Sequence, residues 1–318
     1  MLKESYLKKY KPKFYKDFFI DKEYVDILNT LQNMDNLNIL FIGDHGVGKT
    51  SIINATINEY YGIKNISSEN ILYINSLKEQ GIQYYRNNLK TFCQTKSTCP
   101  FKKKFIVLDD IDMINEQSQQ VFRNCIDKYS NNVNFLISCT NNQKVIDNIQ
   151  SRTTIIKLKK ISNKNIKKLF ERVKNNENIK IKKNAEKFLF NICNNSINKL
   201  LNNLEKFKIY NKTIDEKNIK NISTNISYTL FENYTKFWLD KDYKNSINIL
   251  LTIQKKGYSV LDILDSYFSF IKITDIVDEE KKYKIIKYIL KSIQIFYTNN
   301  ENEIELAFFT NNLIINLC

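Results

Sequence analysis

A short glycine-rich stretch carries the residue types that bind a chain of phosphates. Three of the six glycines lie within positions 43–48, and Lys49 and Thr50 follow directly. In this G-x-x-x-x-G-K-T spacing, backbone N–H groups curl around phosphate oxygens, the lysine reaches the β- and γ-phosphates, and the threonine hydroxyl binds Mg²⁺. The pattern therefore predicts that ATP and Mg²⁺ bind here, with contacts from Gly43, Asp44, His45, Gly46, Val47, Gly48, Lys49, Thr50 and Ser51.

A second group of candidate residues follows an apolar segment further along the chain. Residues 105–108 are Phe-Ile-Val-Leu, and Asp109 and Asp110 come next. Ligands of open α/β sheets bind at the carboxyl ends of the strands, so these acids are placed to meet the phosphates. Asp109 would hold Mg²⁺, and Asp110 would orient or deprotonate the attacking water. With the glycine-rich loop, they predict an ATPase.

The elements that position these residues are visible in the apolar periodicity. Residues 37–42 read as a buried strand before the loop, and 50–60 as a helix after it. The phosphates would then lie on the helix N-terminus, where unpaired N–H groups and the macrodipole favour negative charge. Short apolar strands alternate with helical stretches, which predicts an α/β fold with a parallel sheet covered on both faces. The five strands are predicted at 38–42, 71–75, 104–109, 134–139 and 154–158.

The rest of the chain is predicted to be helical. Three domains follow from this reading: an ATP-binding domain over 1–160, a small helical domain over 161–224 and a larger helical domain over 225–318. The last one is more apolar than a monomeric helical domain of its length requires. Core packing is the default explanation, and an oligomer contact is the alternative.

The net charge of +15 is unevenly distributed. Residues 1–160 carry 23 basic and 16 acidic side chains, 161–224 carry 15 and 6, and 225–318 carry 11 and 12. A basic front part with a neutral tail favours contact between the front part and a nucleic acid. Lysine-rich codon usage is the alternative, but it would have enriched the tail equally. The run 102–104, Lys-Lys-Lys, is expected to be a solvated strand entrance.

Two further observations limit the function. No apolar run reaches about 18 residues and no signal-peptide pattern opens the chain, so we expect an intracellular protein that is neither secreted nor membrane-embedded. The only histidine, His45, lies in the glycine-rich loop, which excludes Ser-His-Asp and Cys-His chemistry elsewhere. The six cysteines are scattered, and only Cys93 and Cys99 lie near each other, which argues against a zinc site.

Several motifs resemble those of the small subunits of replication factor C, the AAA+ ATPases of clamp loaders. The segment 7–12 is similar to the family's V-E-K-Y-R-P stretch, and 75–86 to its N-A-S-D-E-R-G-I segment. Residues 109–112 stand where the family has D-E-A-D, and 119–123 resemble Q-Q-A-L-R. Finally, 135–139 resemble F-I-L-S-C and 149–152 match I-Q-S-R, whereas the helical tail is similar in pattern only.

The resemblance implies a fold and residue roles that composition does not provide. The fold would be an AAA+ P-loop domain, a helical lid domain and an all-α collar domain. Arg152 would be an arginine finger that enters the ATP site of the adjacent subunit. Thr140, or else Asn141, would hold the attacking water. The nucleotide would also contact Leu7 and Lys11 beside the adenine, and Asn198 at the second sensor position.

The resemblance also implies partners. Arg86, Lys90 and Arg123 would contact the phosphate backbone of primer–template DNA, although Arg123 is also spaced to pair with Asp127 on one helix. The chain would join other clamp-loader subunits, most readily in a hetero-pentamer, and act on a sliding clamp. Replication sites in a nucleus or a cytoplasmic viral factory are the expected location, and the AT-rich coding style is compatible with a large DNA virus or a protist.

Departures from the family pattern leave two functions open. Asp110 replaces a glutamate, and Asn198 replaces the second sensor arginine, with Lys199 as a neighbour. One function is an ATPase subunit that opens a clamp and places it on primed DNA. The other is a nucleotide-binding structural subunit with little hydrolysis of its own that lends Arg152 to its neighbour. A third alternative is an initiator or helicase loader, which would require an additional recruiting segment.

Overall fold

The computed structural model describes residues 4–19, 22–62, 67–75, 82–296 and 300–317. The chain forms two compact units. The first comprises Met1–Glu171 together with Asn195–Leu201, and the second comprises Arg172–Asn194 together with Asn202–Cys318. The predicted three-domain boundaries remain a prediction.

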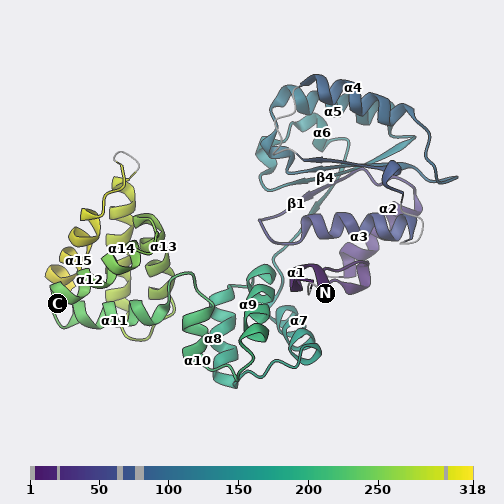
Figure 1. Cartoon of the computed structure of the whole chain (residues 1–318). Coiled ribbons are helices and arrows are strands. Elements are labelled where there is room, and N and C mark those ends of the chain that lie inside the picture. The colour runs from purple at the N-terminus through teal and green to yellow at the C-terminus, as the bar shows by residue number, and fades with distance from the viewer. Residues whose placement is uncertain (1–3, 20–21, 63–66, 76–81, 297–299, 318) are drawn as a thin grey trace. The chain divides into compact units, whose positions relative to one another are not determined.

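The first unit contains a five-stranded parallel sheet in the order β2-β3-β4-β1-β5 (Figure 1). Strand β4 lies between β1 and β3, so the carboxyl ends of these three strands face the same edge, where Ile42 aligns with Cys139. The predicted α/β fold is therefore confirmed, and each strand lies within one residue of its expected bounds. The strands are β1 (Ile39–Ile42), β2 (Ile71–Asn75), β3 (Lys104–Asp109), β4 (Val133–Cys139) and β5 (Thr154–Lys157).

Helices cover both faces of this sheet. Because successive side chains of a strand point to opposite faces, Ile106 and Leu108 pack into one apolar core, whereas Phe105 and Val107 pack into another. The first core lies beneath the helices α4 (Ile82–Gln94), α5 (Glu116–Tyr129) and α6 (Asp147–Gln150), and the second beneath α2 (Lys22–Asn33) and α3 (Lys49–Tyr61) (Figure 1). A short helix, α1 (Tyr6–Lys9), precedes them.

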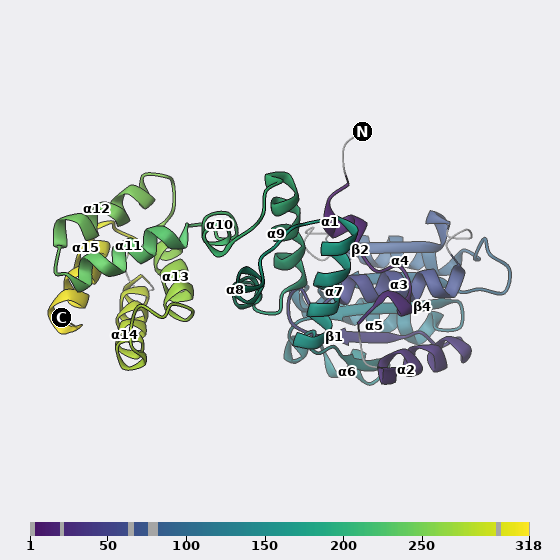
Figure 2. The ribbon, with the colours of Figure 1, turned by 90° about the horizontal axis from the view of Figure 1, so that it is seen from below.

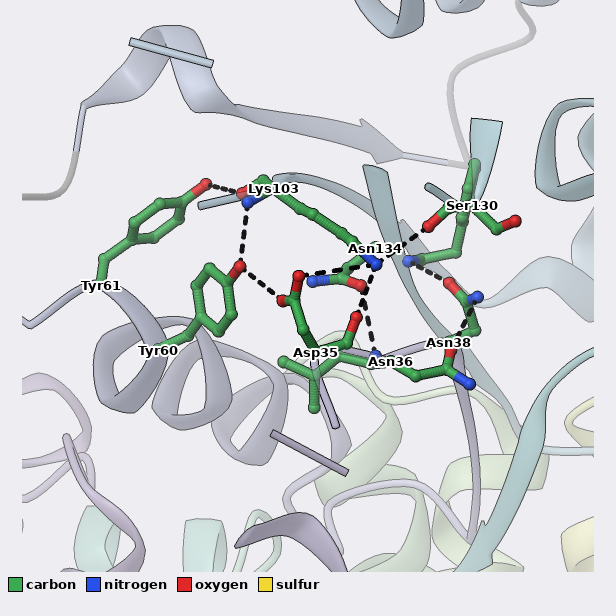
Figure 3. Close-up of polar contacts among 10 residues, drawn as sticks. Asp35, Asn36, Asn38, Tyr60, Tyr61, Lys103, Ser130 and Asn134 are labelled. Atoms are coloured by element: carbon green, nitrogen blue, oxygen red, sulfur yellow. Dashed lines mark hydrogen bonds and ion pairs between the residues drawn. The ribbon is translucent and has the colours of Figure 1, made fainter. Parts of the chain in front are cut away.

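The amino ends of the central strands are joined by a polar network (Figure 3). The Lys103 ammonium donates to the carbonyl oxygen of Asp35 at 2.6 Å and to that of Ser130 at 3.2 Å. The hydroxyl of Tyr60 donates to the Asp35 carboxylate at 2.7 Å and accepts from the Lys103 N–H at 2.9 Å. The next residue, Lys104, is 4% exposed and donates to the Thr95 hydroxyl at 2.6 Å. The expectation of a solvated strand entrance was wrong, because Lys103 and Lys104 donate to partly buried carbonyl and hydroxyl groups and Lys104 is itself buried.

The remaining helices continue to the end of the described chain. In the second unit, α11 to α15 share one apolar core, and both Figure 1 and Figure 2 show them as one group. Its centre is polar as well as aromatic, since the Trp238 indole donates to the Tyr267 hydroxyl at 3.1 Å. The helices are α7 (Asn163–Asn176), α8 (Lys183–Cys193), α9 (Ile197–Tyr210), α10 (Glu216–Ile222), α11 (Tyr228–Leu239), α12 (Tyr243–Gln254), α13 (Val260–Ile271), α14 (Glu279–Ile295) and α15 (Ile304–Leu317).

Candidate nucleotide-binding site

The glycine-rich loop connects β1 to α3, as the spacing predicts. Gly48 is the N-cap of α3 and has φ 107°, a backbone conformation that a residue with a Cβ adopts only with strain. A Cβ at Gly43 would lie 3.0 Å from the carbonyl oxygen of Leu158, so a larger residue would require that backbone to shift by a few tenths of an ångström. The first N–H groups of α3 have no acceptor within the helix, so the loop and this helix end can bind an anion.

Lys49 brings positive charge to this loop. Its side chain is largely buried, with 7% exposure, and its ammonium donates to the carbonyl oxygens of Gly43 at 2.8 Å and Asp44 at 3.4 Å. The ammonium is thus held over the loop by the loop's own backbone. A phosphate bound by the same backbone would lie within reach of this charge, which is the role that the motif predicts.

The two predicted Mg²⁺ ligands lie together. The Thr50 hydroxyl donates to Oδ2 of Asp109 at 2.9 Å. The buried Ser138 hydroxyl donates to the other oxygen of Asp109 and so orients this carboxylate from β4. Among the described residues, no group of three His, Cys, Asp or Glu side chains is placed to hold a metal. One carboxylate and one hydroxyl suit Mg²⁺, which takes most of its remaining ligands from phosphates and water rather than from a protein cage.

Asp110 is held by its backbone and not by its side chain. Its N–H donates to Oγ of Ser138 at 3.0 Å, and its backbone is left-handed, with φ 54°. In the described part of the chain, its carboxylate makes no hydrogen bond. Burial, followed by the charge of Asp109, raises the pKa of the Asp110 carboxyl. A carboxylate with a raised pKa and no internal partner is suited to accept a proton from water.

Asp112 fixes the residue that the family resemblance places beside the attacking water. Its Oδ2 accepts hydrogen bonds from the Thr140 N–H at 3.1 Å, from the Asn141 N–H at 3.0 Å and from the Thr140 hydroxyl. Burial acts to raise the pKa of Asp112, but these hydrogen bonds outweigh it and the pKa lies below its ordinary value. The Thr140 hydroxyl donates to Asp112 and retains lone pairs that can accept from a water molecule.

The other predicted nucleotide contacts differ in how far the structure places them. The side-chain amide of Asn198 lies beside the loop, 3.8 Å from the position that a Cβ at Gly46 would occupy. Asp44 is exposed and pairs with Lys160 at 3.0 Å, and the hydrogen bond from Lys160 lowers the Asp44 pKa. His45 is also exposed. The hydrogen bonds of the site do not extend to the N-terminal positions, so the adenine contacts of Leu7 and Lys11 remain predictions, as do those of Val47 and Ser51.

Arg152 lies just after α6 and is bound to neighbouring helices rather than to the loop. Its Nε pairs with Oδ1 of Asp127 on α5, and its Nη1 donates to the carbonyl oxygen of Asn148 at 2.9 Å. Arg123 pairs with the other oxygen of Asp127 at 3.1 Å, so the ion pair expected from their helical spacing is present. None of these contacts involves residues 43–51. Arg152 therefore does not complete the site of its own chain.

The remaining DNA candidates lie on α4. Lys90 is exposed on this helix, and α4 packs against α5, which carries Arg123. The Arg86 side chain and the segment 76–81 lie outside the described residues, so their predicted contacts are neither supported nor contradicted. The phosphate contacts of all three residues remain predictions.

The sequence patterns did not indicate a functional role for two residues of the site, Ser138 and Asp112. Ser138 appears there only as part of a family-like segment, and Asp112 only as the last letter of an acidic motif. Each had a signal. Ser138 is the one hydroxyl in the apolar run 135–139, and a polar group inside a buried strand needs a partner. Asp112 lies two residues after the acids of the strand end, and a carboxylate so close to a buried strand needs a hydrogen-bond partner if it becomes buried.

Comparisons with known proteins show which sequences this chain resembles. Residues 39–161 match the model of the ATPase family associated with various cellular activities (AAA). The chain is 27% identical to replication factor C subunit 4 of Saccharomyces cerevisiae, over 91% of this chain and 88% of the relative. It is 26% identical to replication factor C subunit 2 of Arabidopsis thaliana, over 86% and 83%. A replication factor C small subunit of Methanocella arvoryzae is 31% identical, but over only 57% of this chain and 56% of that relative.

Two solved structures from Thermotoga maritima share the fold. A DNA polymerase III gamma subunit-related protein has a TM-score of 0.55 at 13% identity and covers 91% of this chain and 98% of its own. A RuvB Holliday junction branch migration motor has a TM-score of 0.54 at 12% identity, with 72% and 79% coverage. The phosphate loop, the sheet order and the sequence relatives agree: residues 39–161 match the AAA family of ATPases, and most of the chain is similar to subunits of replication factor C.

Proposed function

We propose that the chain is an ATPase subunit of a clamp loader. ATP binding would let the assembly open a sliding clamp and hold primer–template DNA, and hydrolysis would release the closed clamp. The observation that carries this proposal is the separation of two half-sites. Lys49 and Asp109 form the nucleotide side, whereas Arg152 is bound to Asp127 on α5 and contacts none of the loop. Arg152 would then act on the nucleotide bound by an adjacent subunit and not on that of its own chain.

The proposed chemistry assigns one task to each group of the site. The loop and Lys49 hold the β- and γ-phosphates, and Thr50 and Asp109 hold Mg²⁺, which neutralises charge on the transferring phosphoryl group. Asp110 accepts a proton from the attacking water, and Thr140 orients that water. The neighbour's equivalent of Arg152 stabilises the transition state from the other side. Asn198, which lies beside Gly46, contacts the phosphates in place of the family's arginine.

DNA is the proposed partner of the first unit. Lys90 is exposed on α4, and Arg123 lies on the adjacent α5 with 33% of its side chain exposed. With Arg86, they would contact phosphates without reading sequence, as a protein that acts at any primed site requires. The excess positive charge before residue 225 supports the same partner. Binding through phosphates predicts an affinity that falls steeply as salt rises.

Other clamp-loader subunits are the proposed partners of the last helices. Tyr283 and Leu290 on α14 are 74% and 58% exposed, and Phe308 and Ile315 on α15 are 57% and 64% exposed. Each pair is seven residues apart and so lies on one side of its helix, and α14 packs against α15. Large apolar side chains exposed on two helices that pack together favour a protein contact. We place this contact in a hetero-pentamer at sites of DNA replication.

Among the described residues, no helix combines the length and apolar character that crossing a membrane requires.

A second candidate function keeps the nucleotide but not the hydrolysis. The Asp110 side chain is one methylene shorter than the glutamate that replication factor C small subunits have at this position. A misplacement of about 1 Å of a catalytic group can lower the reaction rate on the order of 100-fold. In that case the subunit would hold ATP, lend Arg152 to its neighbour and contribute mainly structure. The two functions differ in the response of this subunit's own site to substitution of Asp110.

The test measures clamp loading and ATP turnover of the assembly that copurifies with the chain, with and without primed DNA. Lys49→Ala and Arg152→Ala should each abolish loading and lower DNA-stimulated turnover, whereas the exposed Lys236→Ala serves as a matched control and should not. Unchanged turnover in both variants would refute the proposal. If the subunit hydrolyses ATP, Asp110→Asn should also lower DNA-stimulated ATP turnover relative to wild type. A rise on Asp110→Glu, with no fall on Asp110→Asn, would instead establish the structural subunit.

A further inference from the structure

Asp127 is an acidic residue in an unfavourable part of its helix. It lies in the last turn of α5, which ends at Tyr129, and there the carbonyl ends of the helix repel negative charge. Its side chain is 36% exposed, so water could solvate it. It is instead bound by two arginines, Arg123 on its own helix and Arg152 beyond α6. The position of Asp127 is therefore unfavourable for the stability of α5, but it allows the carboxylate to orient the two arginine side chains.

The contacts leave one end of Arg152 available. Asp127 binds Nε, while the carbonyl oxygen of Asn148, at 2.9 Å, and Oγ of Ser151, at 3.2 Å, bind Nη1. In the part of the chain that the structure describes, Nη2 has no hydrogen-bond partner. Because the guanidinium group is planar, binding two of its nitrogens fixes the direction of the third. A phosphate approached by this arginine would therefore meet Nη2.

Arg123 forms an ion pair with the second oxygen of the same carboxylate. Asp127 uses Oδ1 for Arg152 and Oδ2 for Arg123, at 3.1 Å, so the carboxylate cannot rotate without losing one of the two pairs. Arg123 and Asp127 are four residues apart on α5, a spacing at which side chains meet. Through Asp127, α5 thus binds Arg152, which lies on the turn after α6.

We propose that Asp127 is the positioning residue of Arg152: it orients the guanidinium so that Nη2 points toward the nucleotide of the adjacent subunit, and Arg123 keeps the carboxylate in place. This inference rests on the proposed function, because Arg152 needs a neighbouring nucleotide. Asp127 itself does not touch that nucleotide. It reduces the number of orientations that Arg152 samples, so that less ordering is required in the transition state.

The test uses steady-state ATP turnover of the assembly with primed DNA, in the variants Asp127→Asn, Asp127→Glu, Arg152→Ala and the double variant. Asp127→Asn should lower kcat about tenfold, which is less than the loss expected from misplacing a catalytic group by a full ångström. KM for ATP should stay near its wild-type value, since an arginine finger acts on the transition state. Asp127→Glu should recover most of kcat. Asp215→Asn, which removes an exposed partner of Lys182, is the matched control and should have no effect.

The double variant separates positioning from general stability. In the Arg152→Ala background, Asp127→Asn should produce no further loss, because the residue that Asp127 orients is absent. A wild-type kcat for Asp127→Asn, or an equal loss with and without Arg152, would overturn the inference while the proposed function stands. Failure of the proposed function looks different: turnover would then be insensitive to Arg152→Ala itself.

Discussion

Replacing Ser138 by alanine tests how the site is held together. Ser138 is fully buried on β4, donates to the Asp109 carboxylate and accepts the N–H of Asp110 at 3.0 Å. One hydroxyl thus fixes both acids of the site. Alanine fills nearly the same space, so the substitution removes hydrogen bonds without leaving a large cavity.

The magnitude follows from the two contacts. Loss of a hydrogen bond to a charged group and the unpaired N–H left at Asp110 together should lower the free energy of unfolding by about 2–4 kcal/mol. Without Ser138, Oδ1 of Asp109 loses the hydrogen bond that orients it, while Oδ2 keeps the bond from Thr50 at 2.9 Å. A shift near 1 Å in the acids should lower ATP turnover on the order of 100-fold. The Mg²⁺ concentration for half-maximal turnover should rise, because Asp109 is the proposed ligand.

The assay combines urea unfolding with ATP turnover at several Mg²⁺ concentrations. Ser246→Ala is the matched control, because Ser246 is also fully buried and its hydroxyl donates to the carbonyl oxygen of Asp242 at 2.7 Å. That carbonyl keeps the bond from the Ser246 N–H at 3.1 Å, so the control should lose about 1 kcal/mol and no turnover.

The result that would refute this reasoning is a folded Ser138→Ala variant with wild-type turnover and an unchanged Mg²⁺ requirement. Asp109 would then be oriented by other groups. An equal fall in turnover in Ser138→Ala and in the Ser246→Ala control would also refute it. The fall would then result from lower stability and not from displaced acids.

Three further outcomes are expected. Asp112→Asn should lower the free energy of unfolding by about 1–3 kcal/mol at neutral pH. Because the folded-state pKa of Asp112 lies below its ordinary value of 3.8, this contribution is present above that pH and lost as the pH falls through the folded pKa. The difference from wild type in denaturation curves should therefore shrink in acid, and a pH-independent difference would argue against it. Asn198→Arg should tighten ATP binding in calorimetry, because the side chain lies beside the phosphate loop; no change would place the phosphates elsewhere. Leu290→Lys, with 58% exposure at this position, should leave the chain folded but remove it from the purified assembly in gel filtration, whereas intact assembly would exclude α14 as the contact.

Local signals account for the part of the fold that the sequence predicts well. The phosphate loop was found from the spacing of Gly43, Gly48 and Lys49, and the strands from short apolar runs, which the structure places within one residue. These features depend on neighbours in the chain, because backbone conformation and apolar periodicity are set over a few residues. The charge distribution and the family resemblance are also evident from the amino-acid sequence alone.

Contacts between distant segments account for what the sequence did not predict. Lys102–Lys104 were expected in solvent, yet Lys103 bonds to Asp35 and Ser130, which are far from it in the chain. A lysine run looks the same in the sequence whether its ammonium groups contact water or the carbonyl oxygens of distant residues. The difference arises only when folding brings those carbonyls near, since a buried polar group must then find a partner.

The types and spacing of Lys49, Thr50 and Asp109 were sufficient to predict a nucleotide site, because phosphate and Mg²⁺ chemistry needs those groups wherever they occur. Only the tertiary structure decided how the groups are held. Ser138 reaches Asp109 because β3 and β4 pair in parallel register, and Asp127 reaches Arg152 because α5 lies beside α6. The orientation of a side chain is set by the atoms around it, and those atoms come from parts of the chain that the linear order keeps apart.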